Sequence, residues 1–197
     1  MNNISFQGHS TLVISQKSYN KAEELATRAG RRIISSSKCR LSNGKVFTAN
    51  PDAGSIAVIV RNANDGFLKK IPVNKEPEGI IGEIANAIDA LKAKAKGKLT
   101  AWIIGGDNVN GANGDKTIKT LGSIADELCD RPDIDTSILV GSKSGDDKVF
   151  LHTFNNELEV GLNKDPKAIK NPHIPNEEKM ENYFDIVELN NTDLKID

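Results

Sequence analysis

Two short apolar runs, separated by one amphipathic segment, constrain the fold of this chain most. Residues 99–104 read Leu-Thr-Ala-Trp-Ile-Ile and residues 138–140 read Ile-Leu-Val, and a glycine follows each run. Short, β-branched runs of this kind are typical of buried strands. Residues 118–129, between them, have the apolar spacing of a helix. A strand, a helix and a second strand in this order favour a parallel strand pair, and the sequence therefore predicts an α/β fold.

The remaining segments extend this alternation in both directions. Four further segments have strand composition, and residues 21–29 are rich in helix formers; the strand segments are residues 11–15, 31–36, 45–49 and 55–60. Residues 80–95 form the clearest helix, because apolar side chains recur on one face. These side chains are Ile80, Ile84, Ala87, Ile88 and Leu91. Residues 62–79 contain two prolines and are interpreted as a loop.

We therefore expect a three-layer α/β domain with a mostly parallel central sheet over residues 1–162. Residues 148–154 and 157–162 predict a β-hairpin at its carboxyl end, because Asn155 and Asn156 separate two strand-like runs. Residues 163–197 are polar and contain three prolines. They are expected to form a tail that either docks on the domain or is partly disordered.

Composition excludes several functional classes. The 26 basic and 27 acidic residues give a net charge of −1, which lacks the broad basic surface of a nucleic-acid-binding protein. No apolar run approaches the roughly 20 residues of a membrane span. The two cysteines, Cys39 and Cys129, match no metal motif, so no metal and no cofactor is expected. Residues 1–10 lack the apolar segment of a signal peptide, which favours the cytoplasm, with signal-independent export left open.

Taken in order along the chain, several short segments resemble the self-cleaving cysteine protease domain of large bacterial toxins. The resemblance covers about residues 10–147 and is carried by the order of its segments. These are Ala22-Glu23-Glu24-Leu25-Ala26, Asn50-Pro51-Asp52-Ala53-Gly54, Gly97-Lys98-Leu99, Ile104-Gly105-Gly106, Ser123-Ile124-Ala125-Asp126-Glu127-Leu128, Ile138-Leu139-Val140-Gly141-Ser142 and Asp146-Asp147. The resemblance implies a bacterial protein with a caspase-like fold.

The resemblance also marks three catalytic positions, and none of them carries the expected residue. The family has a histidine where this chain has Gly106, a cysteine where it has Ser142, and an acidic residue near Ser15. A serine hydroxyl stays protonated near neutral pH unless a base takes its proton, and glycine cannot act as that base. We therefore expect a catalytically inactive domain that acts as a secreted bacterial effector, with a role in virulence, or as a protein-binding module. Its partner would be a host target or a secretion component.

The expected binding surface lies at the ends of the two strands. Residues 105–117 are interpreted as a long flexible loop; they do not form a P-loop, because Asp115 stands between Gly114 and Lys116. The expected binding residues are Asp107, Asn108, Asn110, Asn113, Lys116, Ser142 and Lys143. Members of the toxin family bind inositol hexakisphosphate, and the matching basic positions for this or another anion are Arg28, Arg31, Arg32 and Lys98.

The alternative is a thiol enzyme that uses Cys39. Lys38 and Arg40 flank this cysteine and would lower the pKa of its thiol if their charges lie close. Residues 77–160 resemble, more faintly, the chemoreceptor glutamine deamidases. A thiol hydrolase or deamidase of this kind would use His9 or His152 as its base. Cys129 is interpreted as a core residue on the apolar side of a helix.

Overall fold

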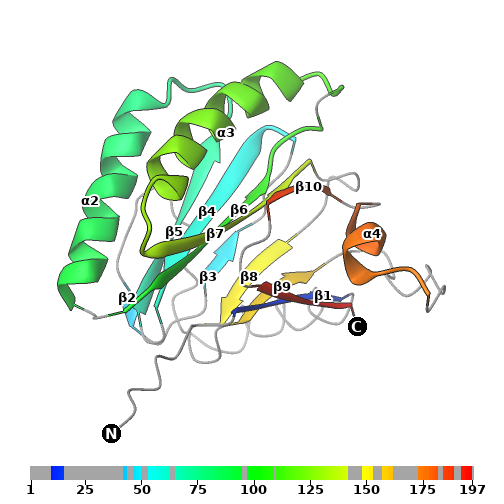
Figure 1. The fold of residues 1–197 in the computed structure, drawn as a ribbon. Helices are drawn as coiled ribbons and strands as arrows, with labels where there is room; N and C mark the ends of the chain where they lie inside the picture. Colours follow the sequence, from blue (N-terminus) through cyan, green and yellow to red (C-terminus); the bar gives the residue numbers. More distant parts are fainter. Residues whose placement is uncertain are drawn as a thin grey trace, which may run out of the picture.

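The computed structural model describes about two thirds of the chain and gives side chains mainly between residues 53 and 141. The described ranges are 10–15, 42–43, 47–49, 53–62, 65–94, 97–108, 110–141, 148–152, 157–161, 173–181, 184–188 and 192–196. The strand expected at residues 31–36 and the helix expected at residues 21–29 lie outside them. Within these ranges the chain forms two β-sheets, two long helices and one short helix (Figure 1).

The larger sheet has six strands among the described residues. In order across the sheet they are β10 (Asp185–Glu188), β7 (Ile134–Val140), β6 (Leu99–Gly105), β4 (Ser55–Arg61), β5 (Asp65–Pro72) and β2 (Ser42–Asn43). β6 and β7 are parallel, as the sequence predicts, and α3 (Gly114–Cys129) connects them. The other neighbouring pairs are antiparallel. The α/β content is confirmed, whereas the prediction of a mostly parallel central sheet is wrong.

The sheet is antiparallel around β4 because the segment predicted as a loop contains β5. The two strands form a hairpin that runs from Ser55 opposite Pro72 to Arg61 opposite Gly66. At its tip the Asn62 N–H donates to the Asp65 carbonyl at 2.9 Å, and the Asp65 N–H donates to Asn62 Oδ1 at 2.8 Å. A tight turn of this kind can join only antiparallel strands, since a parallel pair needs a long crossover.

The second sheet has five described strands, and it draws on both ends of the chain. Its order is β11 (Thr192–Ile196), β1 (Ser10–Ser15), β9 (Glu157–Gly161), β8 (Lys148–His152) and β3 (Phe47–Ala49). β8 and β9 are antiparallel, which confirms the expected hairpin. In the segment expected to be a tail, β10 pairs with β7 and β11 pairs with β1. The short helix α4 (Asn176–Met180) precedes these two strands.

The six-stranded sheet is buried on both faces. On β4, Ile56, Val58 and Val60 belong to the core cluster beneath the helices, whereas Ala57 and Ile59 alternate with them and are equally buried. Figure 1 shows α2 (Glu78–Lys94) and α3 over one face and the five-stranded sheet toward the other. The layers are therefore helices, sheet and sheet. Burial on both faces accounts for the nearly continuous apolar sequence of β4 and β6.

The helix expected over residues 80–95 is confirmed as α2, which begins two residues earlier. Its buried residues are Ile84, Ile88 and Leu91, and Ile80 and Ala87 pack against the same core. They recur at the spacing that places side chains on one face of a helix. Glu78 in the first turn and the lysines of the last turn suit the helix dipole.

Candidate functional site

The carboxyl ends of β6 and β7 lie side by side, where the sequence places the site. Gly105 pairs with Val140 in the parallel register, and the Gly141 N–H donates to the Gly105 carbonyl at 3.2 Å. The backbone then turns through three glycines with positive φ: 106° at Gly105, 82° at Gly106 and 75° at Gly141. Glycine reaches this region without the steric penalty of other residues, so the sequence of both strand ends follows from the sharp turns.

Position 106 has no space for a side chain. Gly106 is buried, and its N–H donates to the Ser55 carbonyl at 2.8 Å. A Cβ atom at this position would lie 2.5 Å from Cγ2 of Thr117 and 3.3 Å from Cγ1 of Ile56. The first distance is far shorter than a carbon–carbon contact at the optimum of about 3.5–4.0 Å. In this conformation a histidine, the residue that the toxin family has here, cannot be accommodated.

The side chain that follows this glycine anchors the start of α3. The Asp107 N–H donates to Thr117 Oγ1 at 2.9 Å, and Asp107 Oδ2 accepts from the Asn113 N–H at 2.8 Å. The carboxylate also fills the space beside Gly111, where a Cβ would lie 2.0 Å from Asp107 Oδ1. A carboxylate at the first turn of a helix satisfies an amide and complements the helix dipole. Asp107, an expected binding residue, is therefore already engaged within the chain.

The neighbouring asparagines hold the loop in the same way. Asn108 Oδ1 accepts from the Asn110 N–H at 3.1 Å, and the Asn108 carbonyl accepts from the Gly111 N–H at 2.9 Å. The Asn113 carbonyl accepts from the Thr117 N–H at 2.8 Å. Residues 114–117, expected to belong to a flexible loop, form the first turn of α3 instead. Of the expected binding residues that the structure describes, Asn110 and Lys116 are exposed.

Of the three positions that the resemblance aligns with a protease, the structure describes two, and they belong to different sheets. Gly106 follows β6 of the six-stranded sheet, whereas Ser15 ends β1 of the five-stranded sheet. Ser142 and the expected binding residue Lys143 lie outside the described residues.

The anion-binding set is described at one position, Lys98. Its Nζ lies 3.2 Å from Asp135 Oδ1, so its charge is compensated within the chain. Arg28, Arg31 and Arg32 lie outside the described residues, and anion binding by this set stays a prediction.

The thiol alternative rests mostly on residues outside the described ranges. Cys39 and His9 are among them, and of His152 the structure gives only its place as the last residue of β8.

The interpretation of Cys129 as a core residue is wrong, because this cysteine is exposed at the end of α3. The buried stripe of α3 runs through Thr120, Ile124 and Leu128, and Cys129 lies one residue beyond it.

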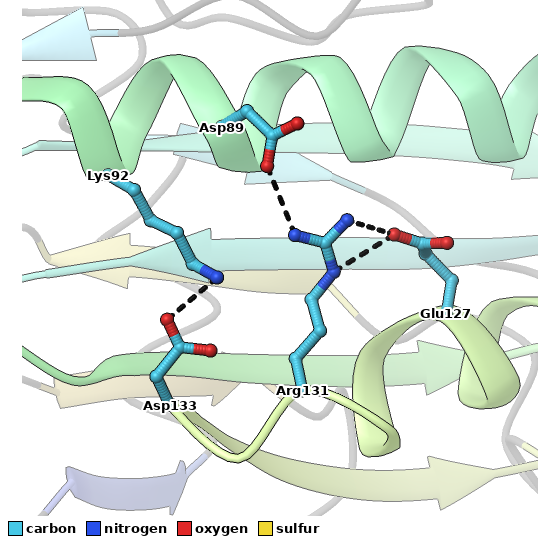
Figure 2. Close-up of polar contacts among 5 residues, drawn as sticks. All are labelled: Asp89, Lys92, Glu127, Arg131 and Asp133. Carbon is cyan, nitrogen blue, oxygen red and sulfur yellow. Dashed lines mark hydrogen bonds and ion pairs between the residues drawn. The ribbon is translucent and has the colours of Figure 1, made fainter.

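Sequence reasoning missed a charge cluster that ties α2 to the turn after α3 (Figure 2). Arg131 binds Asp89 through Nη1 at 3.1 Å and binds Glu127 through Nε at 3.0 Å and through Nη2. Beside it, Lys92 Nζ lies 2.7 Å from Asp133 Oδ2. Glu127 and Arg131 have the i, i+4 spacing of a helical ion pair, but no local pattern predicts that Asp89 joins them.

The electrostatics of this cluster indicate a structural role. Burial tends to lower the pKa of Arg131, but hydrogen bonds to Glu127 and Asp89 outweigh it and raise that pKa. The hydrogen bond from Lys92 lowers the pKa of Asp133, against a smaller opposing effect of burial. Each group is thus stabilised in its charged form by an oppositely charged neighbour.

Sequence reasoning also missed the buried Arg61. It is fully buried at the end of β4, and strand alternation places it with Ala57 and Ile59 on the face toward the five-stranded sheet. Its Nε donates to the Asn62 carbonyl at 3.0 Å. Burial lowers its pKa to about 10, so the guanidinium is still charged at neutral pH. Burying a charge between two sheets costs free energy unless polar or oppositely charged groups surround it.

Two kinds of site are absent from the described ranges. Within them, no group of three or more His, Cys, Asp or Glu residues could hold a metal ion. The helices found there are too short or too polar to cross a membrane.

No protein-family model matches the chain, and no curated protein matches it as a relative.

Proposed function

We propose that this chain is a catalytically inactive relative of the self-cleaving cysteine protease domains of bacterial toxins. In this proposal β6, α3 and β7 correspond to the core of a caspase-like fold. The observation that supports it is the closed space at Gly106, where φ is 82° and Thr117 fills the position of a Cβ. A catalytic histidine would need a different backbone conformation and a displaced Thr117. The strand ends therefore favour a role that needs no base at this position.

The function that fits such a strand end is protein binding, as a secreted bacterial effector or an interaction module. The protein would be made in the bacterial cytoplasm and exported without a cleavable signal peptide. The loop holds its shape through the hydrogen bonds of Asp107 and Asn108, while Asn110, Ala112 and Lys116 are exposed. A surface that is ordered before binding loses less conformational entropy when a partner docks. The partner would be a host target or a component of a secretion system.

Photo-crosslinking from two exposed alanines tests this proposal. A crosslinking amino acid at Ala112 probes the strand-end loop, and the same residue at Ala90, on the exposed side of α2, is the matched control. Both substitutions start from an exposed alanine, so both variants should fold like the parent chain. We expect a discrete protein adduct in host-cell or bacterial extracts from position 112 and none from position 90. Adducts from neither position, or the same adducts from both, would count against a binding surface at the loop.

A further inference from the structure

The one tryptophan of the chain carries a buried hydrogen-bond donor without an acceptor. Trp102 lies in β6 and is fully buried, and its indole Nε1–H has no hydrogen-bond partner in the part of the chain that the structure describes. Native proteins satisfy the large majority of buried donors, and ordered water is a common acceptor where no protein group reaches. An indole N–H in this position therefore indicates a bound acceptor.

The strand beside Trp102 carries one member of a pair of hydroxyl groups that joins the two sheets. Trp102 is opposite Ser137 in the parallel register of β6 and β7, and neighbouring strands are about 4.8 Å apart. Ser137 is buried, and its Oγ lies 2.9 Å from Oγ1 of Thr192 on β11 of the other sheet. Two hydroxyls bring four acceptor lone pairs, of which their mutual hydrogen bond uses one.

We propose that a water molecule bound between the two sheets joins the indole N–H of Trp102 to the hydroxyl pair of Ser137 and Thr192. The water accepts from Nε1–H and donates to a hydroxyl oxygen. Two hydrogen bonds of roughly 2.9 Å let it span up to about 6 Å. With the indole N–H and the two hydroxyls, the water would have the two to four partners that a buried water needs. This water links β6 of one sheet to β11 of the other.

Nuclear magnetic resonance of the full chain tests the proposal directly, because a single tryptophan gives a single indole N–H signal. We expect a nuclear Overhauser contact between that proton and a resonance at the water frequency, and slow exchange of the proton with deuterium. Ser137→Ala should shift the indole signal and weaken the water contact. The absence of a water contact in the parent chain, or a contact to a side chain of the five-stranded sheet in its place, would overturn the proposal.

Thr136→Val provides the matched control. Thr136 precedes Ser137 on β7, but its buried hydroxyl lies on the opposite face of the strand, so its loss should leave the indole signal unchanged. The same variants form two double-mutant cycles, followed by far-ultraviolet circular dichroism. Trp102→Phe combined with Ser137→Ala should depart from additivity by at least about threefold in the unfolding constant. Trp102→Phe with Thr136→Val should be additive, and additivity in both cycles would refute the bridging water.

Discussion

Replacing Gly106 by alanine should destabilise the protein strongly, for two reasons that the structure separates. The backbone there has a φ of 82°, and an L-residue pays about 1–2 kcal/mol for a left-handed conformation. The added methyl group would also lie 2.5 Å from Thr117 Cγ2, and overpacking of this kind costs about 1–3 kcal/mol. The sum is about 2–5 kcal/mol. This is a large part of the ~5–15 kcal/mol by which a typical domain is stable.

Urea unfolding followed by circular dichroism measures the effect, and two further variants divide it. Gly122→Ala is the matched control, because Gly122 lies on the exposed side of α3 with no atom within 4 Å of an added Cβ. It should stabilise the protein by about 0.5–1 kcal/mol, the usual gain from alanine inside a helix. Thr117→Ser in the Gly106→Ala background removes Cγ2 but keeps the oxygen that accepts from the Asp107 N–H. This second substitution should recover part of the stability lost to the steric clash and none of the stability lost to the left-handed backbone.

A Gly106→Ala variant within about 0.5 kcal/mol of the parent chain, the range of an unconstrained surface substitution, would contradict this prediction. Such a result would mean that position 106 has an ordinary backbone conformation and open space beside Thr117. A histidine could then be accommodated there, and nothing at this strand end would exclude protease chemistry.

Three further predictions concern the charge cluster and the exposed thiol. Arg131→Ala should lower the free energy of unfolding by about 1 kcal/mol, since its partner Asp89 is exposed, and equal stability at low salt would contradict this. The pKa of Asp133 lies below its ordinary 3.8, so the stability it contributes is present above that pH and is lost as the pH falls through the lowered pKa. Lys92→Met should raise that pKa in a carbon-13 titration, and an unchanged titration would rule out the ion pair. Cys129 should react with a maleimide in the folded protein, and labelling only after denaturation would show that it is buried.

The regular elements could be predicted where one local pattern suffices. α2 shows its buried face in sequence because Ile84, Ile88 and Leu91 recur at helical spacing, and β6 shows an unbroken apolar run because both of its faces are covered. β5 escaped prediction because Lys69 and Lys70 interrupt its apolar residues and Pro72 ends it. Lys69 is nevertheless buried, because Glu83 of α2 pairs with its ammonium group. The charge of Lys69 is thus neutralised by a residue of another element, and no local pattern could predict that this segment is a buried strand. Without β5, the antiparallel order of the sheet could not be predicted either.

The position of the candidate site could be predicted from the sequence, but the hydrogen bonds of its loop could not. The end of β6 beside β7 follows from the order of strand, helix and strand. Whether Asp107 points to solvent or back to Asn113 depends on the path of the loop and the start of α3. The sequence pattern therefore indicated a binding loop, whereas in the structure the side chains of Asp107, Asn108 and Thr117 hold that loop together.

The most direct test of the proposed inactive domain is to introduce the two residues that the protease family has at the aligned positions. The variant combines Gly106→His with Ser142→Cys. Its cleavage of itself and of a peptide library would be measured by mass spectrometry, with folding followed by circular dichroism. The account predicts a strongly destabilised protein without cleavage, because Thr117 occupies the space that the histidine needs. A stable, folded variant that cleaves itself or a peptide would contradict the account.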